Sequence, residues 1–213
     1  VVLDTTLMRD FVSEIVVDEY RENARNVFTE IAKIKINPNK PNALNKAYQN
    51  KYKFVYGHIE MPHPPFMFDE NGEKPDSIFW PQWGYRAWAN KKGYINQLIY
   101  TNKLTIKMID NITASSKIPP IIIIQGDHGP ASSMKAKSSY ENPDDRMIKE
   151  RFSILNAYYL PNGGHDLLYD SITPVNTFRV IFNHYFGKDY GLLKDRSLYR
   201  NIYFNRDNSP YVE

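Results

Sequence analysis

The sequence predicts an α/β fold, in which buried strands alternate with helices. The first observation is an unbroken run of four isoleucines at 121–124, preceded by Pro119 and Pro120. A strand without polar alternation is typical of a sheet covered on both faces. The second is an apolar spacing near 3.6 over 93–116, which predicts a long amphipathic helix leading into that strand. The third is a strand-like segment at 54–59, Phe-Val-Tyr-Gly-His-Ile, ahead of the helix.

These three elements form a strand, helix, strand unit, in which the two strands are expected to be parallel and joined by a right-handed crossover. The remaining elements are taken in chain order. Residues 7–34 have the spacing of one or two helices, within a helical lead-in over 1–50. Five prolines predict an irregular loop over 61–81. The polar tract 132–149 is expected to be a surface excursion, and 152–160 is a third strand candidate.

The last helix has clear start and stop signals. Thr173 and Pro174 predict its N-cap and first turn, and Gly187 predicts its end. The segment 188–213 is expected to be an irregular tail that wraps over the fold, so that 1–213 belongs to one domain.

Composition excludes several classes of protein. The chain has 213 residues, 42% of them hydrophobic, which is enough for a sizeable core. The net charge of +3 has no dense basic tract behind it, so no nucleic-acid partner is expected. The absence of cysteine removes disulfides, thiolate metal sites and a cysteine nucleophile. No apolar run approaches the roughly 18 residues that span a bilayer, so the chain is expected to be soluble, without a membrane span.

Asp127 and His128 are the candidate metal ligands, because they follow the isoleucine strand, where α/β sheets present functional groups. Gly126 and Gly129 are expected to let the backbone turn tightly around them. One hard oxygen and one imidazole nitrogen suit zinc, manganese or a similar divalent ion, but a complete site needs at least four donors. An ion-paired aspartate with a capping histidine is the equal alternative.

His63 is the candidate substrate-binding residue, because it stands between prolines at the exit of the first predicted strand. Its imidazole could hydrogen-bond a phosphoryl or sulfuryl oxygen, and the alternative is a loop histidine without a role. We predict that it shares one opening with the Asp-His pair. His58 is expected in the core, and structural roles are favoured for His165 and His184.

No serine or threonine has the setting of a nucleophile. Thr5 and Thr6 resemble helix N-caps, and nothing in the sequence fixes the serines that follow the Asp-His pair, which are Ser132, Ser133, Ser138 and Ser139. Four basic residues could clamp a tetrahedral anion, although solvation is the favoured interpretation for each: Lys135, Lys137, Arg146 and Arg151.

Three segments resemble the sulfatase-like hydrolases and transferases of the alkaline phosphatase superfamily. They are 54–68, the isoleucine strand with Gln-Gly-Asp-His-Gly-Pro at 125–130, and 151–161 followed by 171–187. The match covers most of 50–187, and the nearest group is the membrane-anchored bacterial lipoteichoic acid synthases and phosphoglycerol or phosphoethanolamine transferases. The resemblance implies part of a three-layer α/β/α domain with a central, mostly parallel sheet.

The same resemblance assigns roles to the site residues. Asp127 and His128 would be metal ligands for Mn, Zn, Mg or Ca, and His63 would bind the transferred group of a phosphorylated or sulfated envelope lipid or glycan. The family's nucleophile and further acidic ligands precede this region, so the chain is expected to be the carboxyl-terminal part of a larger catalytic domain. It would then be inactive alone and hold metal weakly. The parent would act at the extracytoplasmic face of a bacterial membrane.

Two alternatives to a phosphoryl-group enzyme remain. The first is sulfate ester cleavage. Family members with Asp-His at this motif are more often phosphoryl-group enzymes, so phosphoryl-group transfer or phosphodiester hydrolysis is favoured over it. A non-catalytic module that grips a glycan or a protein is the other alternative, based on the aromatic residues Phe79, Trp80, Trp83, Tyr85 and Trp88, which could instead cover the core of their own loop.

Overall fold

The computed structural model describes residues 7–34, 54–76, 88–134, 139 and 142–199, and divides the chain into two compact units, Val1–Ile118 and Pro119–Glu213. Within these ranges the chain forms helices and one two-stranded antiparallel sheet. The predicted mixture of helix and sheet is therefore confirmed, and no central parallel sheet is seen in the described part of the chain. The elements are α1 (Leu7–Lys33), α2 (Lys91–Ser115), β1 (Ile122–Gln125), α4 (Asp145–Phe152), β2 (Asn156–Tyr159), η4 (Gly164–Leu167) and α5 (Pro174–Phe186).

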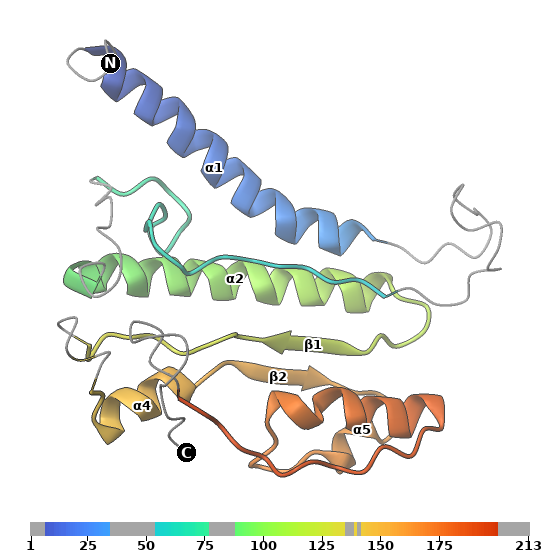
Figure 1. Cartoon of the computed structure of the whole chain (residues 1–213). Coiled ribbons are helices and arrows are strands. Elements are labelled where there is room, and N and C mark those ends of the chain that lie inside the picture. The colour runs from blue at the N-terminus through green and yellow to red at the C-terminus, as the bar shows by residue number, and fades with distance from the viewer. Residues whose placement is uncertain (1–6, 35–53, 77–87, 135–138, 140–141, 200–213) are drawn as a thin grey trace. The chain divides into compact units, whose positions relative to one another are not determined.

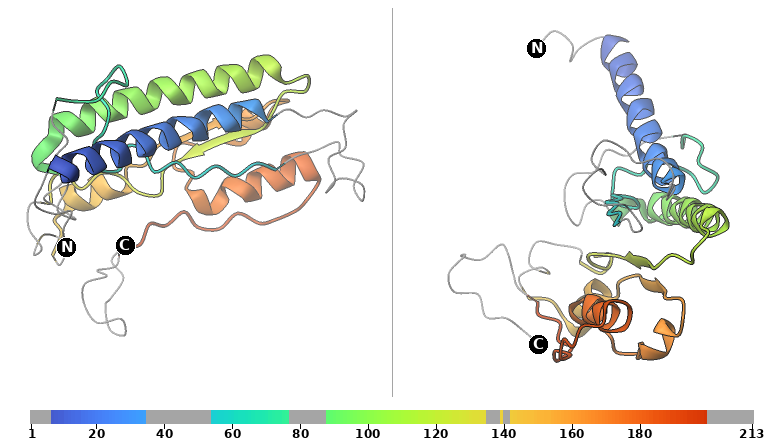
Figure 2. Two further views of the ribbon diagram at one scale, coloured as in Figure 1. Left: turned by 90° about the horizontal axis from the view of Figure 1, so that it is seen from above. Right: turned by 90° about the vertical axis from the view of Figure 1, so that its right-hand side faces the viewer.

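The first unit packs α1 against α2, with the segment 59–68 completing the core (Figure 1, Figure 2). The buried apolar side chains come from all three parts: Val17, Phe28, Met61, Met67, Phe68 and Met108. The helix predicted over 93–116 is confirmed as α2, with Asn90 as its N-cap. Burial of one apolar face stabilises these helices more than intrinsic propensity does.

Gln97, on the buried face of α2, holds the proline-rich loop. The residue is 2% exposed, and its side chain makes three contacts with the loop backbone. The amide nitrogen donates to the carbonyls of His63 at 3.0 Å and Pro65 at 3.4 Å, and the amide oxygen accepts from the Met67 N–H at 2.7 Å. A loop without regular secondary structure thereby gains partners for buried backbone groups. The predicted irregularity is confirmed for the described residues 61–76.

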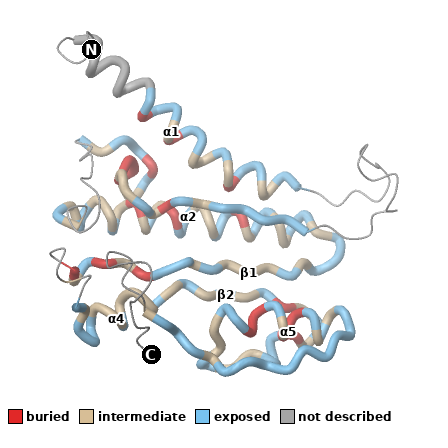
Figure 3. Tube along the Cα trace, viewed as in Figure 1, coloured by how far each residue is buried: buried red, intermediate tan, exposed pale blue. Residues whose placement is uncertain are grey.

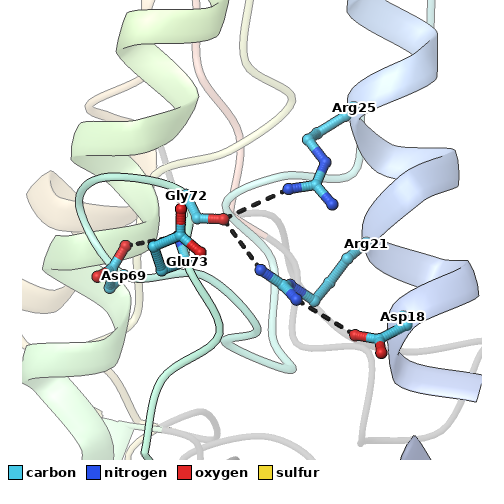
Figure 4. Close-up of polar contacts among 6 residues, drawn as sticks. All are labelled: Asp18, Arg21, Arg25, Asp69, Gly72 and Glu73. Carbon is cyan, nitrogen blue, oxygen red and sulfur yellow. Dashed lines mark hydrogen bonds and ion pairs between the residues drawn. The ribbon is translucent and has the colours of Figure 1, made fainter. Parts of the chain in front are cut away.

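A pair of arginines from α1 reaches a later turn of the same loop, at Gly72 (Figure 4). Arg21 and Arg25 both donate to the Gly72 carbonyl, at 2.9 and 3.4 Å. Their guanidinium groups also lie over the Phe68 ring, 5.1 and 5.5 Å from its centroid. Gly72 has a φ of 89°, and an added Cβ would lie 2.4 Å from the ring of Tyr100. The turn can therefore approach α2 this closely only with glycine at this position.

The second unit contains the sheet. β1 pairs with β2 antiparallel, with Ile122 opposite Tyr159 and Gln125 opposite Asn156. The isoleucine strand and the third strand candidate are thus both confirmed as strands. The expected burial of the isoleucines on both faces is wrong, because β1 is only partly buried (Figure 3). A sheet of two strands and one packing helix leaves area on its faces and edges uncovered.

Helix α5 lies beside β2 and is joined to it by the Tyr158 hydroxyl, 2.7 Å from the hydroxyl of Thr177. Thr173 is the N-cap, Pro174 opens the first turn, and Gly187 closes the helix with a φ of 60°, as the sequence predicts. The Thr173 hydroxyl does not cap the helix. It donates instead to Asp195, which ties the irregular chain after α5 back to the start of that helix.

Two segments differ in secondary structure from the sequence prediction. Helix α4 begins inside the tract 132–149, for which no helix was predicted, and Asp144 caps it by accepting from the Met147 N–H at 2.8 Å. None of the residues of α4 is buried, which agrees with the surface position expected for that tract. Residues 54–59 are not a strand. Their backbone has no hydrogen-bond partner in the described part of the chain, and Phe54 and Tyr56 are 81% and 79% exposed. A strand requires a hydrogen-bonded neighbour, which hydrophobic pattern alone cannot supply.

Across the described ranges, none of the helices combines the length and the apolar character that crossing a bilayer requires.

Candidate functional site

The loop after β1 is attached at both ends to the chain around α4. The Gly126 N–H donates to the Leu155 carbonyl at 2.8 Å, and the Gly129 N–H donates to the Arg151 carbonyl at 2.7 Å. These two hydrogen bonds bracket Asp127 and His128. The pair is therefore presented on a short span of backbone whose two ends are fixed within the second unit.

Gly129 is required by close approach rather than by an unusual backbone angle. A Cβ at this position would lie 2.0 Å from the Glu150 carbonyl oxygen and 2.7 Å from that of Ser153. At Gly126 the nearest atom would be 3.6 Å away, which is ordinary contact. Neither glycine has a positive φ. The turn around Asp127 and His128 therefore uses no left-handed backbone angle at either glycine, and the close approach that requires glycine is seen at Gly129 and not at Gly126.

The side chains of Asp127 and His128 point to a common place at the protein surface. Nε2 of His128 lies 3.5 Å from Oδ2 of Asp127, and the side chains are 48% and 87% exposed respectively. Oδ1 of Asp127 accepts from the His128 N–H at 2.9 Å, which fixes the carboxylate and leaves Oδ2 free to face the ring.

This separation fits two ligands of one ion. Donors about 2.1 Å from a tetrahedral ion lie about 3.4 Å apart, close to the observed 3.5 Å. The donor types, a carboxylate oxygen and an imidazole nitrogen, also suit zinc or manganese. The site is incomplete within the described residues, which contain no group of three or more His, Cys, Asp or Glu side chains able to hold an ion.

Arg151, at the carboxyl end of α4, contacts the other side of the His128 ring. One of its terminal nitrogens, NH1, lies 2.9 Å from Nδ1 of His128 and donates to the Gly129 carbonyl at 2.6 Å. Nδ1 itself lies 3.0 Å from that carbonyl oxygen. Arg151 was expected to be solvated, and the structure places it against the candidate metal pair instead.

Glu150 fixes the chain that follows the pair. Its carboxylate accepts from the backbone N–H groups of Ser132 at 3.0 Å and Ser133 at 2.9 Å, and from both serine hydroxyls. Partial burial acts to raise the pKa of Glu150, but the hydrogen bonds from the two serines outweigh it and lower the pKa below its ordinary value.

The expectation that nothing fixes these two serines is therefore wrong. A carboxylate with a lowered pKa is a poor general base, so its contacts with Ser132 and Ser133 favour a role in holding the loop over activation of a serine nucleophile. Ser138 lies outside the described residues.

His63 lies in the first unit, on the loop that Gln97 holds, and its ring is exposed. Nδ1 is 2.6 Å from the Pro64 carbonyl oxygen, so Nδ1 carries a proton and donates it there. Nε2 of the neutral ring is then an acceptor, and His63 can donate to an oxyanion only as the imidazolium. The opening that His63 and the Asp-His pair were predicted to share stays a prediction.

The other three histidines differ in setting. His58 is exposed, so its expected place in the core is wrong. His165 pairs with its neighbour Asp166 at 2.8 Å, and Nε2 of His184 lies 3.0 Å from the Asn162 carbonyl oxygen. Both contacts agree with the structural roles favoured for them.

Sequence reasoning missed Gln97 and Glu150. Gln97 had a detectable signal, since it lies on the apolar face of the predicted helix, four residues before Thr101 and eleven before Met108, and all three are buried. The sequence signal for Glu150 was weaker. Asp144 is a residue type that favours the N-cap position, and a helix that starts there has residues 150 and 151 in its last turn.

Comparison with known proteins identifies no relative: no family model, no curated protein and no solved structure matches the chain.

Proposed function

We propose that this chain carries part of the metal centre of a larger enzyme that transfers phosphoryl groups, of the phosphoglycerol or phosphoethanolamine type, or hydrolyses phosphodiesters. The observation that carries the proposal is the 3.5 Å separation between Nε2 of His128 and Oδ2 of Asp127. The resemblance of 54–68 and 125–130 to sulfatase-like transferases supplies the reaction class.

Asp127 and His128 would hold a divalent ion, which in such enzymes neutralises charge that develops on the transferred group. Their own backbone keeps them in place, through the Gly126 and Gly129 hydrogen bonds to Leu155 and Arg151. His63, as the imidazolium, would donate from Nε2 to a phosphoryl oxygen, with its ring oriented by the Pro64 carbonyl.

The proposal extends to the fold and the setting of the parent protein. The chain would be the carboxyl-terminal portion of a three-layer α/β/α domain with a central, mostly parallel sheet, anchored at the extracytoplasmic face of a bacterial membrane. The exposed apolar segment 54–56 and the partly exposed isoleucines of β1 support this, because both are surfaces that a larger sheet would cover. Its substrate would be a phosphorylated envelope lipid or glycan.

Metal titration tests the proposal. Zn²⁺ and Mn²⁺ are titrated by calorimetry into the 213-residue chain and into the variants Asp127→Ala and His128→Ala. We expect weak binding by the unsubstituted 213-residue chain, since two protein ligands are fewer than the four of a complete site. We expect that binding to be lost in both variants.

The chain offers a matched control in His165 and Asp166, an adjacent histidine and aspartate in contact at 2.8 Å on η4. Asp166→Ala and His165→Ala are expected to leave the binding unchanged. Equal losses in the two pairs of variants would mean that any exposed His-Asp pair binds the ion, and the proposed centre would be rejected.

The same centre could serve a sulfate ester, and the described residues give no reason to prefer that reaction. A glycan- or protein-binding module receives less support: Trp88 is half-buried, with its ring 4.8 Å from that of Tyr94, as expected of a side chain that covers a local core. The remaining aromatic residues of that cluster, Phe79, Trp80, Trp83 and Tyr85, lie outside the described residues.

A further inference from the structure

Three polar atoms form a closed triangle behind the candidate metal pair. NH1 of Arg151 lies 2.6 Å from the Gly129 carbonyl oxygen and 2.9 Å from Nδ1 of His128, and Nδ1 lies 3.0 Å from the same oxygen. All three distances are within hydrogen-bonding range. Only two of the three contacts can be attractive at once, and the position of the imidazole proton decides which two.

If the neutral ring carries its proton on Nε2, then Nδ1 has a lone pair and accepts from Arg151. The guanidinium can satisfy the ring and the Gly129 carbonyl together, because NH1 bears two hydrogens and is always protonated. If the proton is on Nδ1, the ring donates to the carbonyl, but an N–H then faces the positive guanidinium nitrogen at 2.9 Å. Arg151 therefore favours the proton on Nε2.

That preference opposes metal binding. A histidine that ligates through Nε2 needs a lone pair on that atom, and in metal sites its other nitrogen commonly donates to a backbone carbonyl or a carboxylate. The Gly129 carbonyl is in place for this role, 3.0 Å from Nδ1. The Nε2 atom is also the one that faces Oδ2 of Asp127.

We propose that Arg151 is a positioning residue that holds His128 with its proton on Nε2, and that it must release Nδ1 before His128 can bind a divalent ion. The part of this inference that concerns metal binding rests on the proposed function, whereas the part that concerns the His128 tautomer does not. The proton moves between the two nitrogens of a neutral ring, and the ring gains no charge. Arg151 keeps its second contact, with the Gly129 carbonyl, so it can release the ring without leaving the loop.

The test compares the 213-residue chain with Arg151→Met in two measurements. Long-range proton–nitrogen correlation spectra of the ¹⁵N-labelled chain, recorded where the ring is neutral, report which nitrogen of His128 carries the proton. We expect the proton on Nε2 in the unsubstituted chain and on Nδ1 in the variant. Calorimetry with Zn²⁺ is expected to show binding on the order of 10-fold tighter in the variant, since one charge-assisted hydrogen bond no longer competes with the ion.

Arg146→Met is the matched control, because it removes the same charge from the same helix at an exposed position. In this variant the His128 tautomer is expected to be the same as in the unsubstituted chain. Its Zn²⁺ affinity measures the general effect of losing one positive charge. Arg151→Lys replaces the methionine variant if the latter does not fold. A lysine ammonium lacks the planar fork that spans the ring and the carbonyl, so a mixture of tautomers is expected.

A proton already on Nδ1 of His128 in the unsubstituted chain would overturn the proposal. So would an Arg151→Met variant that binds Zn²⁺ no tighter than Arg146→Met does. If no variant binds Zn²⁺ at all, the proposed metal centre fails, while the tautomer measurement, which needs no ion, still decides the role of Arg151.

Discussion

Substitution of Gly129 by alanine tests whether close approach of the loop to α4 holds the candidate site. The new Cβ would begin 2.0 Å from the Glu150 carbonyl oxygen. Non-bonded carbon and oxygen atoms need about 3.2 Å or more, so loop and helix would have to separate by roughly 1 Å. The nearest atoms are backbone, which cannot move aside as a flexible side chain can.

That displacement breaks the two hydrogen bonds that join Gly129 to Arg151. One is the backbone bond to the Arg151 carbonyl, at 2.7 Å, and the other is the charge-assisted bond from its guanidinium, at 2.6 Å. A neutral bond contributes about 1 kcal/mol and a charged one about 2 kcal/mol, so the local free energy of unfolding should fall by about 3 kcal/mol. Gly126→Ala, where the new Cβ has 3.6 Å of room, should cost less than about 0.5 kcal/mol.

Amide hydrogen exchange of β1, β2 and α4 is the appropriate assay. Denaturation of the whole chain would mix two compact units, whereas exchange at these amides reports on the second unit alone. We expect faster exchange in Gly129→Ala and little change in Gly126→Ala. Equal exchange rates in the two variants would refute the reasoning, since the larger effect at Gly129 is expected from the lack of space for a Cβ there.

Three further predictions concern contacts elsewhere in the chain. Gln97→Leu leaves a buried backbone N–H without its acceptor and should cost about 1–3 kcal/mol, seen as faster amide exchange around His63; unchanged exchange would contradict the anchoring role. Hydrogen bonding, chiefly from the Thr173 hydroxyl, lowers the pKa of Asp195 to about 2, so its stabilisation is complete above the ordinary value of 3.8 and is lost as the pH falls toward 2. A carboxyl titration by NMR should therefore have its midpoint near 2, a midpoint near 3.8 would contradict this, and Asp195→Asn should remove the acid-dependent step. Arg21→Met should cost less than about 1 kcal/mol because Arg25 still donates to the same carbonyl, whereas the double variant should lose more than the sum of the single losses; additive losses in denaturation would show that the two arginines act independently.

Local chemistry explains which elements could be predicted. The helix over 93–116 was found because its apolar residues repeat with the period of a helix, and α5 because proline and glycine have strong positional preferences at helix ends. The isoleucine run produced β1, and 152–160 contained β2. In each case the signal lies within a few residues of the element itself.

Predictions that depended on a distant partner failed. Residues 54–59 have the composition of a strand but no hydrogen-bonded neighbour in the described chain, and β1 pairs antiparallel with a strand that follows it. Helix α4 was missed because its residues are largely polar and its packing against Gly129 appears only in three dimensions.

For the candidate site, the sequence by itself determined the donor types and their order, Asp127 and then His128 after an apolar strand, because side-chain chemistry and strand propensity are local properties. Only the tertiary structure decided that the two donors lie 3.5 Å apart, that Arg151 occupies the far side of the ring, and that Gly129 cannot be replaced without moving backbone. These are distances between atoms brought together by chain folding, and no spacing along the sequence specifies them.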